Sequence, residues 1–251
     1  MHRFYVTDSG FDKTIEITGS DVNHAVNVLR LKKDDIVTVC DGRSNDYTCR
    51  ISEINEKSII CDIEDIERSY AELPVNITLF QGLPKGDKME FIIQKAVELG
   101  AVSVYPVIMQ RSVVKIDDKK KNKKTERYAA VAESAAKQSR RGIIPEIPGI
   151  IDYKEAIRIA KSFDTILLPY EEAEGIEASR SLLEDICKNH KKGQTIGIFI
   201  GPEGGFTKEE VQMAEDAGAN VITLGNRILR TETAGMMLLS VLSFLMEEKG
   251  N

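Results

Sequence analysis

Residues 200–206 have the composition of a turn that brings backbone close to a ligand. An apolar run, Ile196–Ile200, enters the turn, and Thr207–Glu210 follows it with the pattern of a helix capping box. The turn holds three glycines: Gly201, Gly204 and Gly205. The carboxylate of Glu203 would repel phosphate, and the chain contains neither a Walker nor a dinucleotide-binding motif. The turn therefore favours a nucleoside without phosphate, such as S-adenosylmethionine, although a plain strand–turn–helix joint would use the same glycines.

A second segment whose residues could bind a ligand or take part in catalysis is "LGNRILRTETAGMM", residues 224–237. Arg227 and Arg230 lie in a loop after a predicted strand, where each could bind a carboxylate or phosphate in a bidentate manner. Thr231 is a predicted N-cap, and Glu232 suits the positive end of the helix dipole. The helix that follows is apolar on nearly all sides, so it is predicted either to be buried or to pack against another subunit.

Two predicted domains position these segments. The first, residues 1–70, has the pattern of a small β-barrel with one helix at Ser20–Val28. Its predicted strands are His2–Val6, Lys13–Ile17, Ile36–Cys40, Asp46–Ile54 and Ser58–Ile66. After Pro74, apolar strands alternate with amphipathic helices, which predicts a second domain, residues 74–251, with a parallel sheet covered on both faces. Its predicted helices include one with Asp87 as N-cap and Gly100 at its end, one that ends at Gly142, and one near Ile176–Asn189. The glycine turn and the arginine loop then both lie at the carboxyl edge of that sheet, where such sheets bind ligands.

The bulk composition excludes several classes of protein. The net charge is −6, and the start of the chain has no apolar signal segment, so we expect a cytoplasmic protein without membrane spans. The four cysteines are far apart and the three histidines are scattered, so neither a metal site nor a disulfide framework is predicted. We expect the thiols to be reduced and packed.

Positive charge is concentrated in one segment. Residues 111–141 carry 11 Lys and Arg against 4 Asp and Glu, which indicates either a site for a polyanion or a solvated loop. Residues 1–70 carry 9 basic and 14 acidic side chains, so that domain binds a polyanion only if its basic residues share one side.

These motifs carry a family resemblance that covers essentially the whole chain. "IGPEGGFTKEE" and "LGNRILRTETA" resemble the signature of the bacterial RsmE family, the 16S rRNA uracil-N3 methyltransferases of the SPOUT superfamily. "LPKGDKMEFIIQKAVELG", "RSVVK", "ERYAAVAESAAKQSRR" and "HAVNVLRLKKDD" resemble its other motifs. The resemblance implies a PUA-like RNA-binding barrel, a C-terminal α/β domain with a trefoil knot, a homodimer and S-adenosylmethionine as cofactor.

The resemblance also implies site residues. The cofactor pocket would be lined by Leu168, Pro169, Ile200, Gly201, Gly204, Gly205, Leu224, Ile228, Leu229, Arg230, Thr231 and Ala234. For catalysis, Arg230 is expected to stabilise a developing uracil anion, and Glu232 and Glu203 are candidate bases. Arg230 could instead form an ion pair with either carboxylate, and the carboxylates could shape the loop or cap the helix. His24 is a further titratable candidate, although a lone histidine in a small barrel is usually structural.

The RNA substrate, 16S rRNA within the small ribosomal subunit, would be held by basic residues of both domains. The candidates are Arg3, Arg30, Lys32, Lys33 and Arg43 in the first domain, and Arg111, Lys115, Lys137, Arg140 and Arg141 in the second. We expect them to contact phosphates and so to set affinity and salt dependence. In "KQSRRG", Arg140 stands where many relatives are expected to have a smaller residue.

Three other functions stay open from the sequence. One is a ribose 2′-O-methyltransferase of rRNA or tRNA in the same superfamily. Another is a non-catalytic RNA-binding factor for ribosome assembly. A third, a nucleotide enzyme that binds phosphate, is disfavoured by Glu203.

Overall fold

The computed structural model describes residues 2–7, 11–113, 118–173 and 175–247, the side chains of 118–120 excepted. The chain forms two compact units. The first comprises Met1–Glu72 with Ala136–Ile144, and the second comprises Leu73–Ala135 with Pro145–Asn251. The segment 136–144 therefore belongs to the first unit, although it lies within the residues 74–251 of the predicted second domain.

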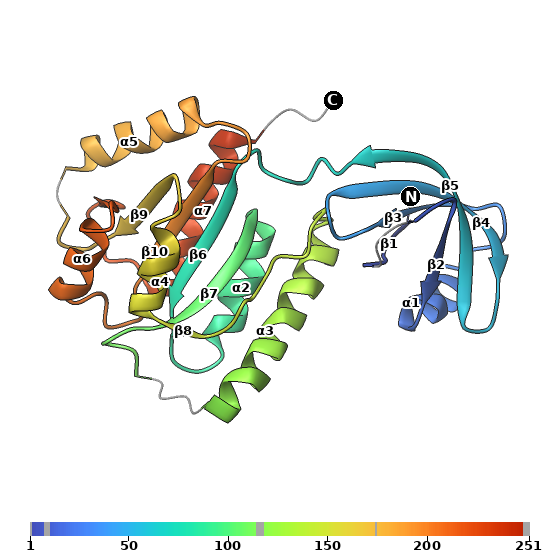
Figure 1. Ribbon diagram of the computed structural model, residues 1–251, viewed down its shortest axis with the longest axis horizontal. Helices are drawn as coiled ribbons and strands as arrows, with labels where there is room; N and C mark the ends of the chain where they lie inside the picture. Colours follow the sequence, from blue (N-terminus) through green and yellow to red (C-terminus); the bar gives the residue numbers. More distant parts are fainter. Residues whose placement is uncertain (1, 8–10, 114–117, 174, 248–251) are drawn as a thin grey trace. The chain divides into compact units, whose positions relative to one another are not determined.

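The first unit is a curled five-stranded sheet with the strand order β1-β3-β4-β5-β2 (Figure 1). Its elements are β1 (His2–Tyr5), β2 (Thr14–Thr18), α1 (Ser20–Asn23), η1 (His24–Val28), β3 (Ile36–Cys40), β4 (Asn45–Ile54) and β5 (Ser58–Arg68). β1 runs parallel to β3, and the other ladders are antiparallel. Register shifts at Thr48/Cys49 and Ile51/Glu53 bend the long β4–β5 pair around its core.

The first unit differs from the sequence prediction in two details. Among the described residues, β1 and β2 are the two edges of the sheet and are not paired, so the sheet is curled without closing into a barrel. The predicted helix over Ser20–Val28 changes from α to π geometry at His24 and has no side-chain N-cap. Gly19, whose φ is 69°, occupies the N-cap position.

The second unit is built on a parallel six-stranded sheet with the order β11-β9-β10-β6-β7-β8. Its strands are β6 (Asn76–Gly82), β7 (Ala101–Ile108), β8 (Ile151–Asp152), β9 (Thr165–Pro169), β10 (Thr195–Ile200) and β11 (Asn220–Ile222). Its helices are α2 (Lys88–Glu98), α3 (Asp118–Gln138, which continues into the first unit), α4 (Tyr153–Ala160), α5 (Ile176–Asn189), α6 (Lys208–Glu215) and α7 (Thr231–Met246). The alternation of strands and helices that the sequence predicts after Pro74 is confirmed.

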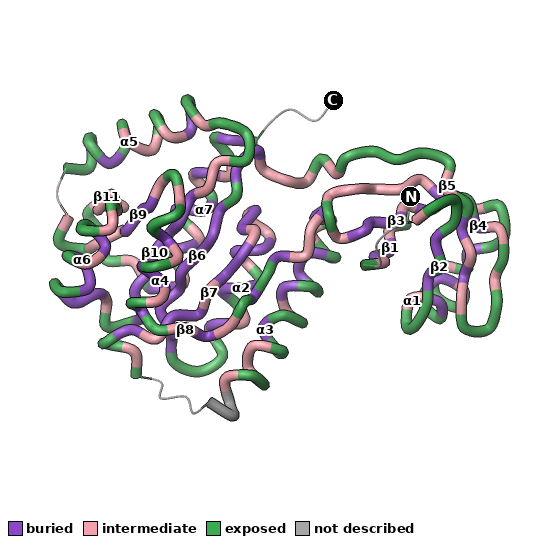
Figure 2. Tube along the Cα trace, in the orientation of Figure 1, coloured by how far each residue is buried: buried purple, intermediate pink, exposed green. Residues whose placement is uncertain are grey.

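Helices cover both faces of this sheet (Figure 1). Phe80 and Phe199 stack at 4.6 Å between ring centroids, in a core that includes Tyr153 of α4 and Val211 of α6. The side chain of Leu79 points to the opposite face, towards α7. The central strands are therefore buried from both sides (Figure 2), as their nearly continuous apolar sequences indicate.

Helix ends follow the sequence in some places and not in others. Gly100, with φ 94°, follows the end of α2 as predicted. Asp87 precedes α2, but its side chain makes no capping hydrogen bond. α3 ends at Gln138 and not at Gly142, because Arg140 turns the chain with a φ of 59°.

Candidate functional site

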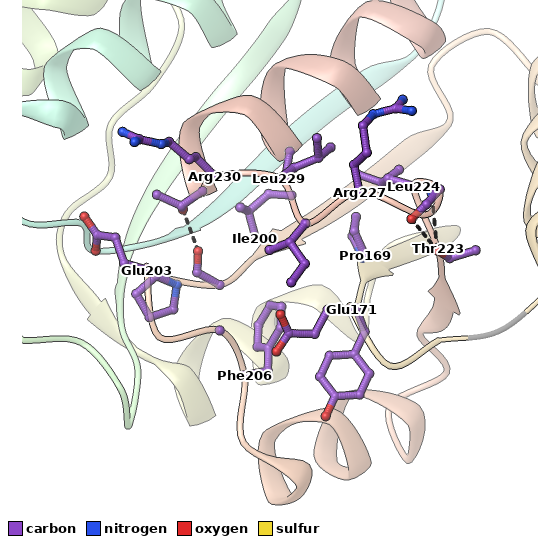
Figure 3. Close-up of a pocket in the computed structure, with 18 of the residues that line it drawn as sticks. Pro169, Glu171, Ile200, Glu203, Phe206, Thr223, Leu224, Arg227, Leu229 and Arg230 are labelled. Carbon is purple, nitrogen blue, oxygen red and sulfur yellow. Dashed lines mark hydrogen bonds between the residues drawn. The ribbon is translucent and has the colours of Figure 1, made fainter.

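A cavity of about 360 Å³ opens at the carboxyl edge of the parallel sheet. Its walls are the segments that follow β9, β10 and β11, together with the start of α7 and the first residue of α2 (Figure 3). The lining residues are Lys88, Pro169, Tyr170, Glu171, Ile200, Gly201, Pro202, Glu203, Gly205, Phe206, Thr223, Leu224, Gly225, Arg227, Ile228, Leu229, Arg230, Thr231 and Ala234. The glycine turn and the arginine loop thus share one cavity.

The glycine turn is held by its own backbone and by the neighbouring strand. The N–H of Gly205 donates to the carbonyl of Pro202 at 2.9 Å, and Gly205 has a φ of 68°, which favours glycine. A Cβ on Gly82, at the end of β6, would lie 2.5 Å from the backbone nitrogen of Pro202. The close approach of β6 to the turn therefore requires glycine at position 82.

Thr231 joins the two cavity segments. Its hydroxyl donates to the carbonyl oxygen of Gly201 at 2.6 Å and accepts from Nε2 of Gln81 at 2.8 Å. It is not the N-cap that the sequence predicts, because α7 begins one residue earlier than a capping threonine requires and Arg230 occupies the cap position. The hydroxyl stabilises tertiary structure instead of the helix end.

The predicted capping box at the start of α6 is confirmed. Thr207 accepts a hydrogen bond from the N–H of Glu210, and the carboxylate of Glu210 accepts one from the N–H of Thr207. The other oxygen of Glu210 accepts from the N–H of Gln110 at 2.8 Å. The capping box therefore also fixes the segment after β7 beside the glycine turn.

One lysine lies between two carboxylates at the cavity. Nζ of Lys88 is 3.2 Å from Oε1 of Glu203 and 3.5 Å from Oε2 of Glu232. Glu203 also accepts a hydrogen bond from the N–H of Lys85. Burial acts to raise the pKa of Glu203, but the hydrogen bonds from backbone N–H groups and Lys88 outweigh it, so the pKa lies below its ordinary value.

The arginine loop leaves its charges exposed at the rim. Arg227 and Arg230 extend away from the apolar walls in Figure 3. Within the described part of the chain, Arg230 forms no ion pair with Glu203 or Glu232, so the alternative structural role considered for it is not observed. Ile228, between the two arginines, is 86 % exposed.

Most residues expected at a cofactor pocket line this cavity, with two exceptions. Leu168 is fully buried in the core between the sheet and the helices α4 and α6. Gly204 lies against Arg111, whose Nη1 donates to the carbonyl of Gly204 at 2.9 Å. The strand periodicity turns Leu168 away from the cavity, because alternate residues of β9 point to opposite faces.

Sequence reasoning did not single out Lys88, Tyr170 or Glu171, which also line the cavity. For Lys88 a signal existed: a lysine in the first turn of a helix is unfavourable at the positive end of the dipole. Tyr170 and Glu171 directly follow β9, and the rule that open parallel sheets bind ligands at the carboxyl ends of their strands could have indicated them.

The basic residues predicted to bind RNA differ in how far their charges are exposed and in whether they are paired. Arg141 is 2 % exposed and forms an ion pair with Glu72 at 2.6 Å, so it does not present its charge to a phosphate. Arg3 is partly buried and pairs with Asp46, and Arg111 holds the glycine turn. Arg111 is exposed in the second unit, and the other exposed candidates, all in the first unit, are Arg30, Lys32, Lys33, Arg43, Lys137 and Arg140. Lys115 lies outside the described residues.

Other sequence candidates have no part in the cavity. His24 is exposed in the first unit and lines a separate, small hollow of about 160 Å³ with His2.

The cysteines are unpaired and buried, and burial raises the pKa of Cys49 to about 12 and of Cys61 to about 11. Within the described residues, no three His, Cys, Asp or Glu side chains are grouped to hold a metal ion, and no helix is long and apolar enough to cross a bilayer.

Comparison with known families yields two matches along the chain. Residues 71–243 match the family of RNA methyltransferase domains, and residues 17–64 match the RNA methyltransferase PUA domain. The chain is 37 % identical to the ribosomal RNA small subunit methyltransferase E of Bacillus subtilis, over 93 % of this chain and 91 % of that protein. It is 32 % identical to the protein of the same name from Aquifex aeolicus, over 96 % of this chain and 99 % of that protein.

Solved structures give the same result. The ribosomal RNA small subunit methyltransferase E of Neisseria gonorrhoeae, bound to S-adenosyl methionine, superposes with a TM-score of 0.79 at 34 % identity, covering 98 % of each chain. A putative methyltransferase of Legionella pneumophila, in complex with the bound cofactor SAM, superposes with a TM-score of 0.77 at 28 % identity, covering 96 % of each chain.

Proposed function

Because this chain belongs to the ribosomal RNA small subunit methyltransferase E family, we propose that it transfers a methyl group from S-adenosylmethionine to N3 of a uridine in 16S rRNA. The observation that carries the proposal is the cavity at the carboxyl edge of the parallel sheet, where a carboxylate occupies the glycine turn. We further propose that the substrate is the small ribosomal subunit in the cytoplasm, since the named relatives act on its RNA.

The cavity fits S-adenosylmethionine. Its volume is in the range of small-molecule sites, and Pro169, Ile200 and Leu229 provide apolar walls for an adenine ring. Glu171 and Glu203 are acidic groups suited to a cationic ligand, whereas a phosphate would be repelled by them. The arginines at the rim suit the carboxylate of the methionine part. When bound, the cofactor supplies an electrophilic methyl group on a positively charged sulfur.

The protein has to make N3 of uracil nucleophilic. N3 carries a proton, so the flipped base must be held beside the methyl donor while that proton leaves. We propose that Arg230, which is exposed and makes no ion pair with the nearby carboxylates, stabilises the negative charge that develops on the base.

We propose Glu232 as the group that accepts the N3 proton. Its Oε2 atom is buried and accepts no hydrogen bond among the described residues, and Lys88 lies at 3.5 Å. Glu203 is less suited to this step, because its lowered pKa makes it a weaker base.

Two further proposals concern the binding of RNA and the knot. The exposed basic side chains of the first unit support binding of RNA phosphates there, in keeping with its match to a PUA domain. Thr231, the first residue of α7, is hydrogen-bonded to Gly201, which directly follows β10, and to Gln81 of β6. These bonds are compatible with the trefoil knot that the resemblance implies. Neither proposal requires Arg141 or Leu168 to contact a ligand.

A homodimer is supported by the apolar surface of α7. Phe244 is 83 % exposed and Leu245 is 50 % exposed, and Phe91 is exposed on α2, which packs against α7. A second copy of the chain would cover this surface. Phe244→Asp should convert a dimer into a monomer in light scattering, and a monomeric wild-type protein would remove the proposal.

The direct test of the activity is a product analysis. The purified protein is incubated with methyl-labelled S-adenosylmethionine and unmodified small subunits, and the digested RNA is examined by mass spectrometry. Label in N3-methyluridine supports the proposal. Label on a ribose would establish 2′-O-methylation instead, and absence of both label and cofactor binding would leave an RNA-binding protein without catalysis.

A further inference from the structure

Lys88 is in an unfavourable position for a lysine. It is the first residue of α2, where the positive end of the helix dipole favours Asp or Glu. The preceding Asp87 makes no side-chain cap that would offset this charge. The local sequence of the helix therefore gives no stabilising reason for an ammonium group at this position.

Two carboxylates from other segments hold the ammonium group. Glu203 comes from the glycine turn at 3.2 Å, and Glu232 comes from the first turn of α7 at 3.5 Å. The Lys88 side chain keeps 37 % of its surface exposed and lines the cavity. An ammonium group has three donors, so a donor remains for a ligand in the cavity beside the two carboxylates.

From this geometry we infer that Lys88 donates a hydrogen bond to a carbonyl oxygen of the target uracil and stabilises the uracil anion, with Glu203 and Glu232 positioning the ammonium group. The inference rests on the proposed methylation of uracil N3. Uracil presents carbonyl oxygens on both sides of N3, and the negative charge of the N3-deprotonated base is delocalised onto them.

The charges balance in this arrangement. The N3–H bond breaks and its proton passes to the carboxylate of Glu232, so the negative charge moves from Glu232 to the uracil. The N3 electron pair forms the bond to the methyl carbon, and the carbon–sulfur bond breaks with its electrons left on sulfur as a neutral thioether. The negative charge beside Lys88 is on Glu232 before the proton moves and on the uracil afterwards. The ammonium group is therefore never left without a neighbouring negative charge.

The test compares Lys88→Met with wild type on ordinary small subunits and on subunits that contain 5-fluorouridine. Fluorine withdraws electrons and makes the N3 proton more acidic, so the anion needs less stabilisation. We expect Lys88→Met to lower kcat by roughly 10²-fold on uridine, and by clearly less on 5-fluorouridine. Lys88→Arg, which keeps the charge, should lose less than Lys88→Met.

Two controls make the result specific. The affinity for S-adenosylmethionine, measured by calorimetry, shows whether each variant is folded and should stay within about twofold of wild type for Lys88→Arg. Lys154→Met removes an exposed lysine from α4, away from the cavity, and should behave as wild type on both substrates.

The outcomes separate this inference from the proposed function. Equal losses on uridine and 5-fluorouridine, or an unchanged kcat in Lys88→Met, would overturn the role of Lys88 while the wild-type product still supports the methyltransferase. A wild-type enzyme that makes no N3-methyluridine would overturn the proposed function itself.

Discussion

The hydroxyl of Thr231 connects the glycine turn directly to the start of α7, and its removal is predicted to weaken cofactor binding. Thr231→Val keeps the shape of the side chain and removes the donor to the Gly201 carbonyl and the acceptor for Gln81. Gln81 retains its bond to the carbonyl of Gly82, but the Gly201 carbonyl loses a short hydrogen bond in a buried position. No cavity arises, so the effect is one of hydrogen bonding alone.

The magnitude follows from the cost of an unsatisfied buried acceptor, which is about 1–3 kcal/mol. If this loss acts wholly on the arrangement of the turn that binds the cofactor, the Kd for S-adenosylmethionine rises by roughly 5- to 140-fold, since each 1.4 kcal/mol is about tenfold. If it acts on the whole unit, the free energy of unfolding falls by the same amount.

The assay is titration calorimetry of S-adenosylmethionine into the purified protein, together with urea unfolding of the same samples. Thr231→Ser is the matched control, because it retains the hydroxyl, and it should bind the cofactor far more tightly than Thr231→Val. The reasoning is refuted if Thr231→Val matches wild type in both the Kd and the free energy of unfolding.

Three further predictions concern the rest of the chain. Glu72→Ala leaves the buried guanidinium of Arg141 without its carboxylate, so the free energy of unfolding should fall by about 3–5 kcal/mol in urea titrations; a change below 1 kcal/mol would contradict a buried pair. Burial and raised pKa values should keep Cys49 and Cys61 unreactive to thiol reagents at pH 8 until the protein is unfolded, and rapid modification of the native protein would show them to be accessible. Because the pKa of Glu203 is lowered in the fold, its contribution to stability is complete above the ordinary carboxyl value of 4.5 and is lost as the pH falls through the lower folded value. Glu203→Gln should therefore unfold with a shallower dependence on pH below 4.5 than wild type, with little difference in that dependence between pH 6 and 8.

Local patterns predicted the elements because each depends on neighbours in the chain. The capping box at Thr207 and the glycine after α2 were predicted correctly, and α5 has the predicted bounds Ile176–Asn189. Where a side chain had a stronger partner elsewhere, the local rule failed. The hydroxyl of Thr231 bonds Gly201 and Gln81 instead of capping α7, and Arg141 is turned inwards to Glu72 instead of outwards to RNA.

The sequence by itself determined the order of strands and helices, the two segments that form the cavity and the chemical class of ligand that their charges favour. These properties depend on periodicity, turn residues and the sign of a carboxylate, which are present before the chain folds. The tertiary structure decided which side chains face the cavity. Lys88 meets Glu203 and Glu232 only because β6, β10 and β11 end at the same edge of the sheet, and a contact between residues more than a hundred positions apart has no local signal.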